Sequence, residues 1–349
     1  MATFREAREA LLFACQDGSI DETEFALLYD LNSSENLEFP YWNGSKTDFR
    51  FFKNDIYLLG EVLDIPDIMK CPNGILVDGT EALSVLLKCF AYPCQFADMV
   101  ARFGRPVPQL CMITNRMMDY LFDEYSHLFA DLIQPWLSRD RLRHFAATIH
   151  AKGAPLENCW GFIDRTVGPL CKPDENQRIL YNGHKRVHGI KFQSVVAPNG
   201  LIASLFGPVE GRRHDSGMLV DSGLLQELSH YSFAPDGTPL CVYGDPAYTL
   251  RVHLVHLQGP FKGAHLKPAE QQFNKAMSQV RVSVEWLFGD IVNYFAFLDF
   301  KKNLKISLSP VGKMYIVCAL LRNGHSCLYP SSTSKFFGID PPQIQDYSN

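Results

Sequence analysis

Short apolar runs of strand length alternate with helical patterns in the later part of this 349-residue chain, and this alternation most constrains its fold. The apolar runs cover residues 159–164, 190–197, 201–206 and 239–245, and the helical patterns cover residues 215–231, 269–295 and 314–321. Pro198-Asn199-Gly200 separates the two middle runs and is a strong hairpin signal. The order strand, hairpin, helix, strand, helix predicts an α/β domain with the hairpin at one edge of its sheet.

Two of the apolar runs end in an aspartate. Asp164 and Asp245 each follow a strand-like run and precede a turn. Open α/β sheets place reactive groups at strand ends, where side chains face a crevice. An aspartate in such a place is also a common turn residue or helix cap, so each residue alone has this simpler interpretation.

The long helical pattern adds a third acid. Asn274, Arg281, Glu285 and Gly289 are spaced 7, 4 and 4 residues apart and therefore share one helix face. An apolar stripe runs beside this face, which places Glu285 at the rim of the core. The alternative is an Arg281–Glu285 pair on a solvated face, worth only ~0.3 kcal/mol.

A fourth acid, Asp215, closes the segment from Glu210 to Asp215 and could also be the N-cap of the following helix. Carboxylates that converge on one place repel one another unless cations neutralise them. Hard divalent cations such as Mg²⁺ or Mn²⁺ suit oxygen ligands and support in-line phosphoryl displacement. We therefore expect the acids to hold divalent cations over a phosphodiester; they are Asp164, Asp215, Asp245 and Glu285.

Charge is distributed unevenly around the net value of −5. Residues 1–70 carry 14 acidic and 6 basic residues, so residues 71–349 carry a net charge of +3. The acidic head is either a solvated surface or a protein-docking segment. Residues 165–191 carry a net charge of +4 and could follow a phosphate backbone, with plain solvated surface as the alternative. The candidate nucleic-acid contacts are Arg165, Lys185, Arg186, Arg212 and Arg213.

The region before the α/β domain is predicted to be helical. A short helix at residues 96–103, a turn at Gly104-Arg105-Pro106 and a following helix have the spacing of a helix-turn-helix, with Arg102, Arg105 and Arg116 as phosphate contacts. Three-helix packing without DNA reading is the alternative. The predicted division is an acidic segment at 1–47, a helix-turn-helix-like domain at 48–150, the α/β domain at 151–338 and a tail at 339–349.

The ten cysteines lack a Cys-x-x-Cys pair, which argues against a structural zinc site and favours reduced core residues of a cytosolic or nuclear protein. The chain shows neither a signal peptide nor an apolar run of membrane-spanning length. We expect a soluble intracellular protein without a membrane partner.

Four motifs in order resemble those of PIF/Harbinger-type transposases and their domesticated nuclease relatives. They are Gly161–Thr166, Gly211–Asp215, Tyr243–Tyr248 and the helix that carries Asn274, Arg281, Glu285 and Gly289, and the four acids lie 51, 30 and 40 residues apart. The resemblance covers about residues 48–338. It implies an RNase H-like fold, a mixed sheet flanked by helices, with Asp164 on the first strand, Asp245 at the end of the fourth and Glu285 on a helix.

The resemblance also implies roles. Asp164, Asp245 and Glu285 would form a catalytic DDE triad, Asp215 would be a further metal ligand, and His214, Arg281 and Asn274 would support the site. Family members cut DNA at transposon ends, join the 3′ hydroxyl to target DNA, and need a separate Myb-like protein for DNA recognition and nuclear entry. DNA and such a protein are therefore the expected partners, with a homodimer left open, and the nucleus is the expected location, with the cytoplasm as the alternative.

One position departs from the family pattern, because Arg165 stands where the family often has glycine. An extra cation beside the metals could aid phosphate binding or lower metal affinity.

Three functions compete on the sequence. The first is a metal-dependent endonuclease or transposase with a two-metal-ion mechanism. The second is a domesticated, non-catalytic DNA- or protein-binding module that keeps the nuclease fold. The third is a zinc hydrolase that uses His184, His188 and His214, but the first two would lie about 13 Å apart on a strand.

Overall fold

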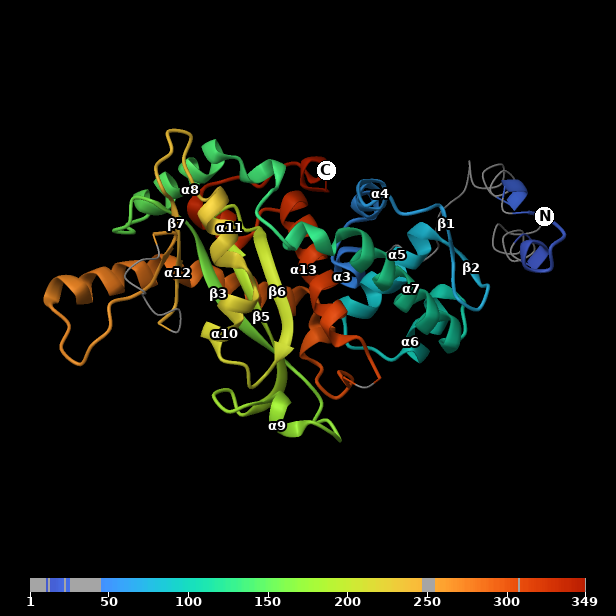
Figure 1. Ribbon diagram of the computed structural model, residues 1–349. Coiled ribbons are helices and arrows are strands. Elements are labelled where there is room, and N and C mark those ends of the chain that lie inside the picture. The colour runs from blue at the N-terminus through green and yellow to red at the C-terminus, as the bar shows by residue number, and fades with distance from the viewer. Residues whose placement is uncertain are drawn as a thin grey trace. The chain divides into compact units, whose positions relative to one another are not determined.

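The computed structural model describes residue 11 and residues 13–21, 23–25, 45–246, 255–306 and 308–348 (Figure 1). The chain divides into two compact units, Met1–Tyr120 and Leu121–Asn349, and the boundary falls inside helix α7 (Val107–Tyr125). The predicted acidic segment at 1–47 lies mostly outside the described residues. Within the described ranges, none of the helices combines the length and the apolar character that a bilayer crossing requires.

The first unit consists mainly of α-helices and contains a two-stranded antiparallel β-ribbon. Its described elements are α3 (Ser45–Phe49), α4 (Lys53–Val62), β1 (Ile68–Lys70), β2 (Leu76–Asp78), α5 (Gly79–Ala91), α6 (Phe96–Phe103) and most of α7. The Asp78 carboxylate caps α5 by accepting a hydrogen bond from the backbone N–H of Glu81 at 2.8 Å. Helix α6 has the predicted bounds and ends at Gly104, whose φ of 66° suits a left-handed cap.

The three arginines predicted to contact phosphates are engaged inside this unit. Arg105 pairs with Glu81 at 2.8 Å, and the Glu81 side chain is 2% exposed. Arg102 pairs with Asp48 at 2.6 Å, and Nε of Arg116 donates to the carbonyl of Lys70 at 3.3 Å. These contacts stabilise the unit's own packing, so they lend no support to DNA reading by the predicted helix-turn-helix.

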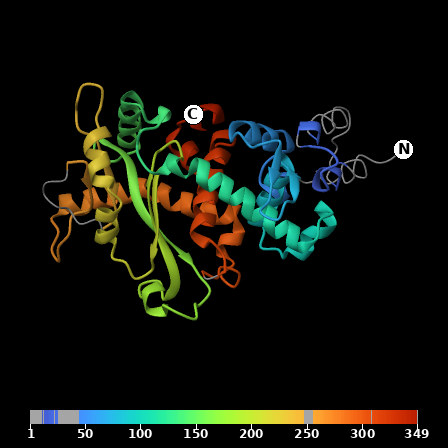
Figure 2. The same ribbon diagram turned by 45° about the vertical axis from the view of Figure 1, so that its right-hand side comes forward.

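The second unit is built on a six-stranded mixed sheet, as the sequence predicts (Figures 1 and 2). Its strands are β3 (Cys159–Pro169), β4 (Tyr181–Asn182), β5 (Val187–Val196), β6 (Ile202–Glu210), β7 (Cys241–Gly244) and β8 (Leu257–Gln258). The order is β4-β5-β3-β7-β8, and β6 pairs with β5. Strands β3, β5 and β6 pair antiparallel, whereas β7 runs parallel to β3 and to β8.

Helices flank this sheet. The α-helices of the unit are α8 (Arg139–Ala151), α9 (Gln177–Leu180), α10 (Asp215–Asp221), α11 (Leu224–Tyr231), α12 (Pro268–Tyr294), α13 (Val311–Leu328), α14 (Ser332–Phe337) and α15 (Ile344–Ser348). The short 3₁₀ helices are η1 (Ser126–Phe129), η2 (Pro135–Leu137) and η3 (Ala296–Asp299). Helices α8 and α12 pack on β3, and α13 packs on β6. Trp160, Phe162 and Val242 from the strands are buried in the core, as are Val284 and Leu287 from α12.

The predicted hairpin is present between β5 and β6. The Asn199 side chain accepts a hydrogen bond from the backbone N–H of Leu201 at 3.1 Å, and Gly200 has a φ of 82°. Because a positive φ strains residues with a Cβ, glycine fits this turn.

Two predicted boundaries are wrong. The first apolar run was expected to end at Asp164, but β3 continues to Pro169 because residues 162–169 pair with β5. The predicted helix at 215–231 is two helices, since the chain turns at Gly223, whose φ of 65° ends α10 and begins α11.

Candidate acidic active site

Asp164 and Asp245 lie on neighbouring parallel strands. The register pairs Ile163 of β3 with Gly244 of β7, so each aspartate is the next residue along its chain. Their side chains are 13% and 18% exposed. Asp245 directly follows the end of β7, as predicted, whereas Asp164 lies inside β3, and the parallel pairing of the two strands brings the two carboxylates close together.

Asp215 enters from the hairpin side. After β6 the chain passes Gly211, where an added Cβ would clash with the carbonyl oxygens of Leu180 and Gly189. This close approach requires glycine and fixes the path of the following residues. Asp215 is the first residue of α10, and His214 is the residue before it, with no side-chain cap hydrogen bond.

Helix α12 brings Glu285 and Arg281. Nη1 of Arg281 lies 3.0 Å from Oδ2 of Asp164, and Nη2 lies 2.9 Å from Oε1 of Glu285. One guanidinium thus joins the helix acid to the strand acid. The Glu285 side chain is 56% exposed while Val284 and Leu287 are buried, so Glu285 stands at the rim of the core.

Arg165 joins the other acids. Its Nη1 contacts the Asp215 carboxylate, its Nη2 lies 3.4 Å from Oδ2 of Asp245, and its backbone N–H donates to Asp164 at 2.8 Å. Lys191 of β5 adds a second cation 3.3 Å from Asp215.

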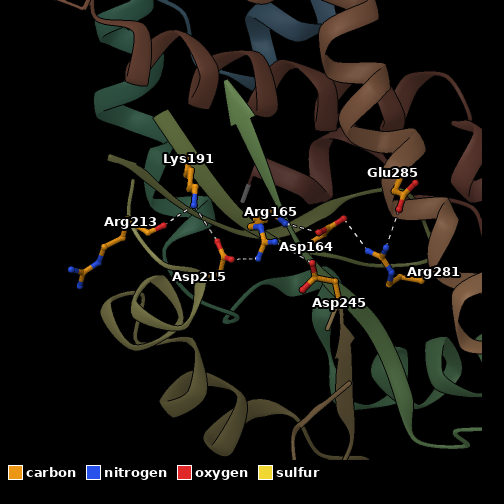
Figure 3. Close-up of polar contacts among 8 residues, drawn as sticks. All are labelled: Asp164, Arg165, Lys191, Arg213, Asp215, Asp245, Arg281 and Glu285. Atoms are coloured by element: carbon orange, nitrogen blue, oxygen red, sulfur yellow. Dashed lines mark hydrogen bonds and ion pairs between the residues drawn. The ribbon is translucent and has the colours of Figure 1, made fainter. Parts of the chain in front are cut away.

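Figure 3 shows the result, a chain of polar contacts that runs from Lys191 through Asp215, Arg165 and Asp164 to Arg281 and Glu285. We call this cluster the acidic network; its members are Asp164, Arg165, Lys191, Asp215, Asp245, Arg281 and Glu285. Its four carboxylates are matched by three cations, which leaves one negative charge.

The pKa of the Asp164 carboxyl is raised. Burial raises the pKa of its carboxyl above the usual 3.8, and the negative charge of Asp245 raises it further. The backbone N–H of Arg165 and the guanidinium of Arg281 act in the opposite direction without cancelling the effect. A cation brought near Asp164 would therefore favour its ionised form.

The donor chemistry of the acidic network fits a hard divalent cation, because every candidate ligand is a carboxylate oxygen. Arg165 bridges Asp215 and Asp245, and Arg281 bridges Asp164 and Glu285. The two carboxylates of each pair are therefore close enough to contact a single cation. Among the residues that the structure describes, no three His, Cys, Asp or Glu side chains already gather as a ready metal group. Guanidinium groups stand between the acids instead, so a metal would have to displace one of them.

The other predicted site residues lie around the acidic network. Asn274 holds the backbone of Phe261, accepting from its N–H at 2.9 Å and donating to its carbonyl at 3.0 Å, so it braces the chain before α12. Arg213 pairs with Asp221, and Arg212, Lys185 and Arg186 have exposed side chains.

The histidines of the zinc hypothesis do not cluster where the structure describes them. His184 is exposed in the turn before β5, and His188 lies on β5 opposite Tyr181. No metal group forms around them among the described residues.

Lys191 is the site residue that sequence reasoning missed, since it was counted only as part of a basic loop. Its side chain is 9% exposed, and Nζ also donates to the carbonyl of Arg213 at 2.6 Å. The available signal was a lysine between Ile190 and Phe192 in a predicted apolar strand. A buried lysine requires a partner, which here is Asp215.

A family model matches the part of the chain that carries these acids. Searches among curated proteins and among solved structures each found no match. Residues 163–323, which include Asp164, Asp215, Asp245 and Glu285, match the model of the family described as DDE superfamily endonuclease.

Proposed function

We propose that the protein is a metal-dependent DNA endonuclease or transposase that cleaves phosphodiesters at the acidic network. The observation that carries the proposal is the joining of Asp164, Asp245 and Glu285 through Arg165 and Arg281, within a span that matches DDE superfamily endonucleases. Nucleases of that superfamily generally use divalent metals.

The chemistry follows from the carboxylates. A bound divalent cation such as Mg²⁺ or Mn²⁺ would polarise the phosphodiester and lower the pKa of an attacking water. Asp164, Asp245 and Glu285 would hold that cation, with Asp215 as a further candidate ligand in the two-ion scheme. Arg281 would position the Asp164 and Glu285 carboxylates, because it contacts both of them.

The DNA would contact basic side chains beside Asp215. A cavity of ≈ 460 Å³ there is lined by Arg212, Arg213 and His214, together with one acid, Glu210. Guanidinium groups hydrogen-bond phosphate oxygens well, and such contacts position a backbone without reading sequence. Lys185 and Arg186 in the β4–β5 turn would extend this surface.

The finer family assignment is also part of the proposal. Along the path β6-β5-β3-β7-β8, leaving aside the two-residue β4, Asp164 lies on the first strand in chain order and Asp245 follows the fourth. This placement supports an RNase H-like domain, and the assignment to the PIF/Harbinger type rests on the motif resemblance alone. That assignment would bring three further properties: a separate Myb-like DNA-binding partner, strand transfer and nuclear location. Each of them rests on the family assignment alone.

A nicking assay tests the proposal. Supercoiled plasmid is incubated with wild-type protein and Mn²⁺, with and without EDTA, and with Asp164→Asn and Asp245→Asn variants. We expect nicking that EDTA and either substitution abolish. Nicking retained by a folded Asp164→Asn variant would remove Asp164 from the active site, and a folded wild type with no nicking on any DNA tested would favour a non-catalytic binding module.

A further inference from the structure

The acidic network contains two guanidinium bridges of different character. Arg281 bridges Asp164 and Glu285, and Arg165 bridges Asp215 and Asp245 (Figure 3). Both occupy the places between carboxylates where a metal cation would go. Which bridge yields to a metal depends on how firmly each guanidinium is held.

The Arg281 bridge has a solvent-facing end. Glu285 is 56% exposed and pairs with Arg281 at i, i+4 on the same helix. Such pairs contribute little to stability, because water and salt screen them. Glu285 can therefore leave Arg281 at little cost and rotate toward a cation beside Asp164.

The Arg165 bridge is closed. The side chains of Arg165, Asp215 and Asp245 are 24%, 20% and 18% exposed, so none faces solvent freely. Lys191, 9% exposed, holds Asp215 from a second side.

The backbone of Arg165 is fixed as well. It lies within β3, where it pairs with Gln193 of β5, and its N–H holds Asp164. Displacing this guanidinium would take a poorly solvated cation away from both carboxylates, which is strongly unfavourable.

We propose that Arg165 is a built-in cation that fills the place between Asp215 and Asp245 and excludes a divalent ion from it. The inference rests on the proposed function, since it assumes that the acids hold divalent ions. It changes one role, because Asp215 then anchors Arg165 and is not a metal ligand. Wild-type protein would bind a single Mn²⁺ tightly, on the side of Asp164 and Glu285.

A guanidinium also differs chemically from a second metal. It stays protonated at any physiological pH and cannot activate water, but it presents several N–H donors to phosphate oxygens. Arg165 would thus contribute charge neutralisation at the scissile phosphate.

Counting bound Mn²⁺ by electron paramagnetic resonance on the full chain tests the proposal without relying on activity. Arg165→Gln removes the bridge and is expected to bind a second Mn²⁺, or to bind the first at least about tenfold more tightly. Arg165→Lys keeps the positive charge at this position, so it should bind no second Mn²⁺. Arg102→Gln is the matched control, because it removes an arginine that pairs with Asp48 in the first unit, and it should stay within about twofold of wild type.

A second variant keeps the test decisive if Arg165→Gln fails to fold. Asp215→Asn should change the affinity for the first Mn²⁺ by less than about threefold, since that ion does not use Asp215. Two tight ions in the wild type, unchanged binding in folded Arg165→Gln, or loss of binding in Asp215→Asn would each overturn the role of Arg165 while leaving the nuclease proposal intact. Absence of Mn²⁺ binding in every variant and the wild type would overturn both proposals.

Discussion

Helix α12 carries two arginine–carboxylate contacts that look alike in chemistry and differ in surroundings. In the acidic network, Arg281 joins Asp164 and Glu285. Further along the helix, Asp290 pairs at 2.8 Å with Arg322 of α13, whose side chain is 1% exposed. Arg322 also donates to the Ser326 hydroxyl at 2.6 Å.

The difference lies in which contact can be exchanged. Arg322 is buried and packs on the ring of Tyr294 at 4.8 Å, so its loss would remove a polar contact that joins α12 and α13. One of the two carboxylates that Arg281 contacts, that of Glu285, is exposed to solvent, so a metal can replace Arg281 as the partner of Glu285. An arginine–carboxylate pair therefore stabilises the fold where two helices bury the arginine, as at Arg322. It can exchange its partner where the carboxylate is exposed to solvent, as at Glu285. We infer that the Arg322 contact helps to fix the helix face that Arg281 and Glu285 occupy.

The sharpest test of this comparison changes one carboxylate in each contact. Glu285→Gln should lower Mn²⁺-dependent plasmid nicking by about 10³-fold or more, which corresponds to about 4 kcal/mol in the barrier, because a cation ligand is lost. Asp290→Asn should nick within about threefold of wild type at a temperature where it is folded, since positions 285 and 290 point about 140° apart on the helix. Equal losses of nicking activity in the two variants would contradict the claim that only the Glu285 contact serves catalysis.

The free energy of unfolding should depend more on the Arg322 contact than on the Arg281 contact, which is the reverse of their ranking in nicking activity. Arg322→Ala is expected to lower the free energy of unfolding by about 3 kcal/mol, because it removes one partner of a buried pair. Arg281→Ala should lower it by less, about 1.5 kcal/mol, because only the contact of Arg281 with Asp164 is sheltered from solvent. Urea unfolding followed by circular dichroism measures both values. A larger loss for Arg281→Ala would mean that the acidic network is the stronger structural contact.

The raised pKa of Asp164 predicts a smaller, pH-dependent effect. Because the folded-state pKa lies above the unfolded value, the stability from this group is complete below the unfolded pKa and is lost as pH rises through the folded pKa. Ionised Asp164 is therefore unfavourable for folding at pH 7, and Asp164→Asn should unfold at a temperature no lower than wild type. Thermal unfolding should show the stability of wild type improving relative to Asp164→Asn as the pH falls toward 4. A variant markedly less stable than wild type at pH 7 would contradict this account.

Asn274→Ala is expected to have the smallest effect. The variant loses two hydrogen bonds to the backbone of Phe261 and should lower the free energy of unfolding by about 1 kcal/mol. Its Mn²⁺ affinity should remain within about twofold of wild type, because Asn274 braces the chain outside the acidic network. A large loss of Mn²⁺ affinity measured by calorimetry would return Asn274 to a supporting role at the acids.

The parts of the site that were predictable from sequence depend on local patterns. An apolar run that switches to aspartate indicates a strand end, and helical spacing places Arg281 beside Glu285. The run that closes on Asp245 does end a strand, and because β7 runs parallel to β3, Asp245 lies beside Asp164, which is inside β3. The hairpin around Gly200 and most of α12 were predictable for the same local reasons.

The parts that were not predictable depend on register between distant segments. Whether Arg165 reaches Asp215 and Asp245 is decided by how β3 aligns with β5 and β7, and hydrophobic patterning does not fix that alignment. Pairing with β5 also carries β3 through residues that look like a turn in isolation. The break before α11 required a positive φ at Gly223, which glycine permits without demanding.

Mn²⁺ binding to wild type and to Asp164→Asn, measured by isothermal titration calorimetry on the full chain, tests the central claim most directly. The account predicts measurable Mn²⁺ binding to the wild type and an affinity at least about 10²-fold lower in the folded variant, a difference of about 2.7 kcal/mol. Equal Mn²⁺ affinity in the two proteins would contradict the claim that these acids share a cation.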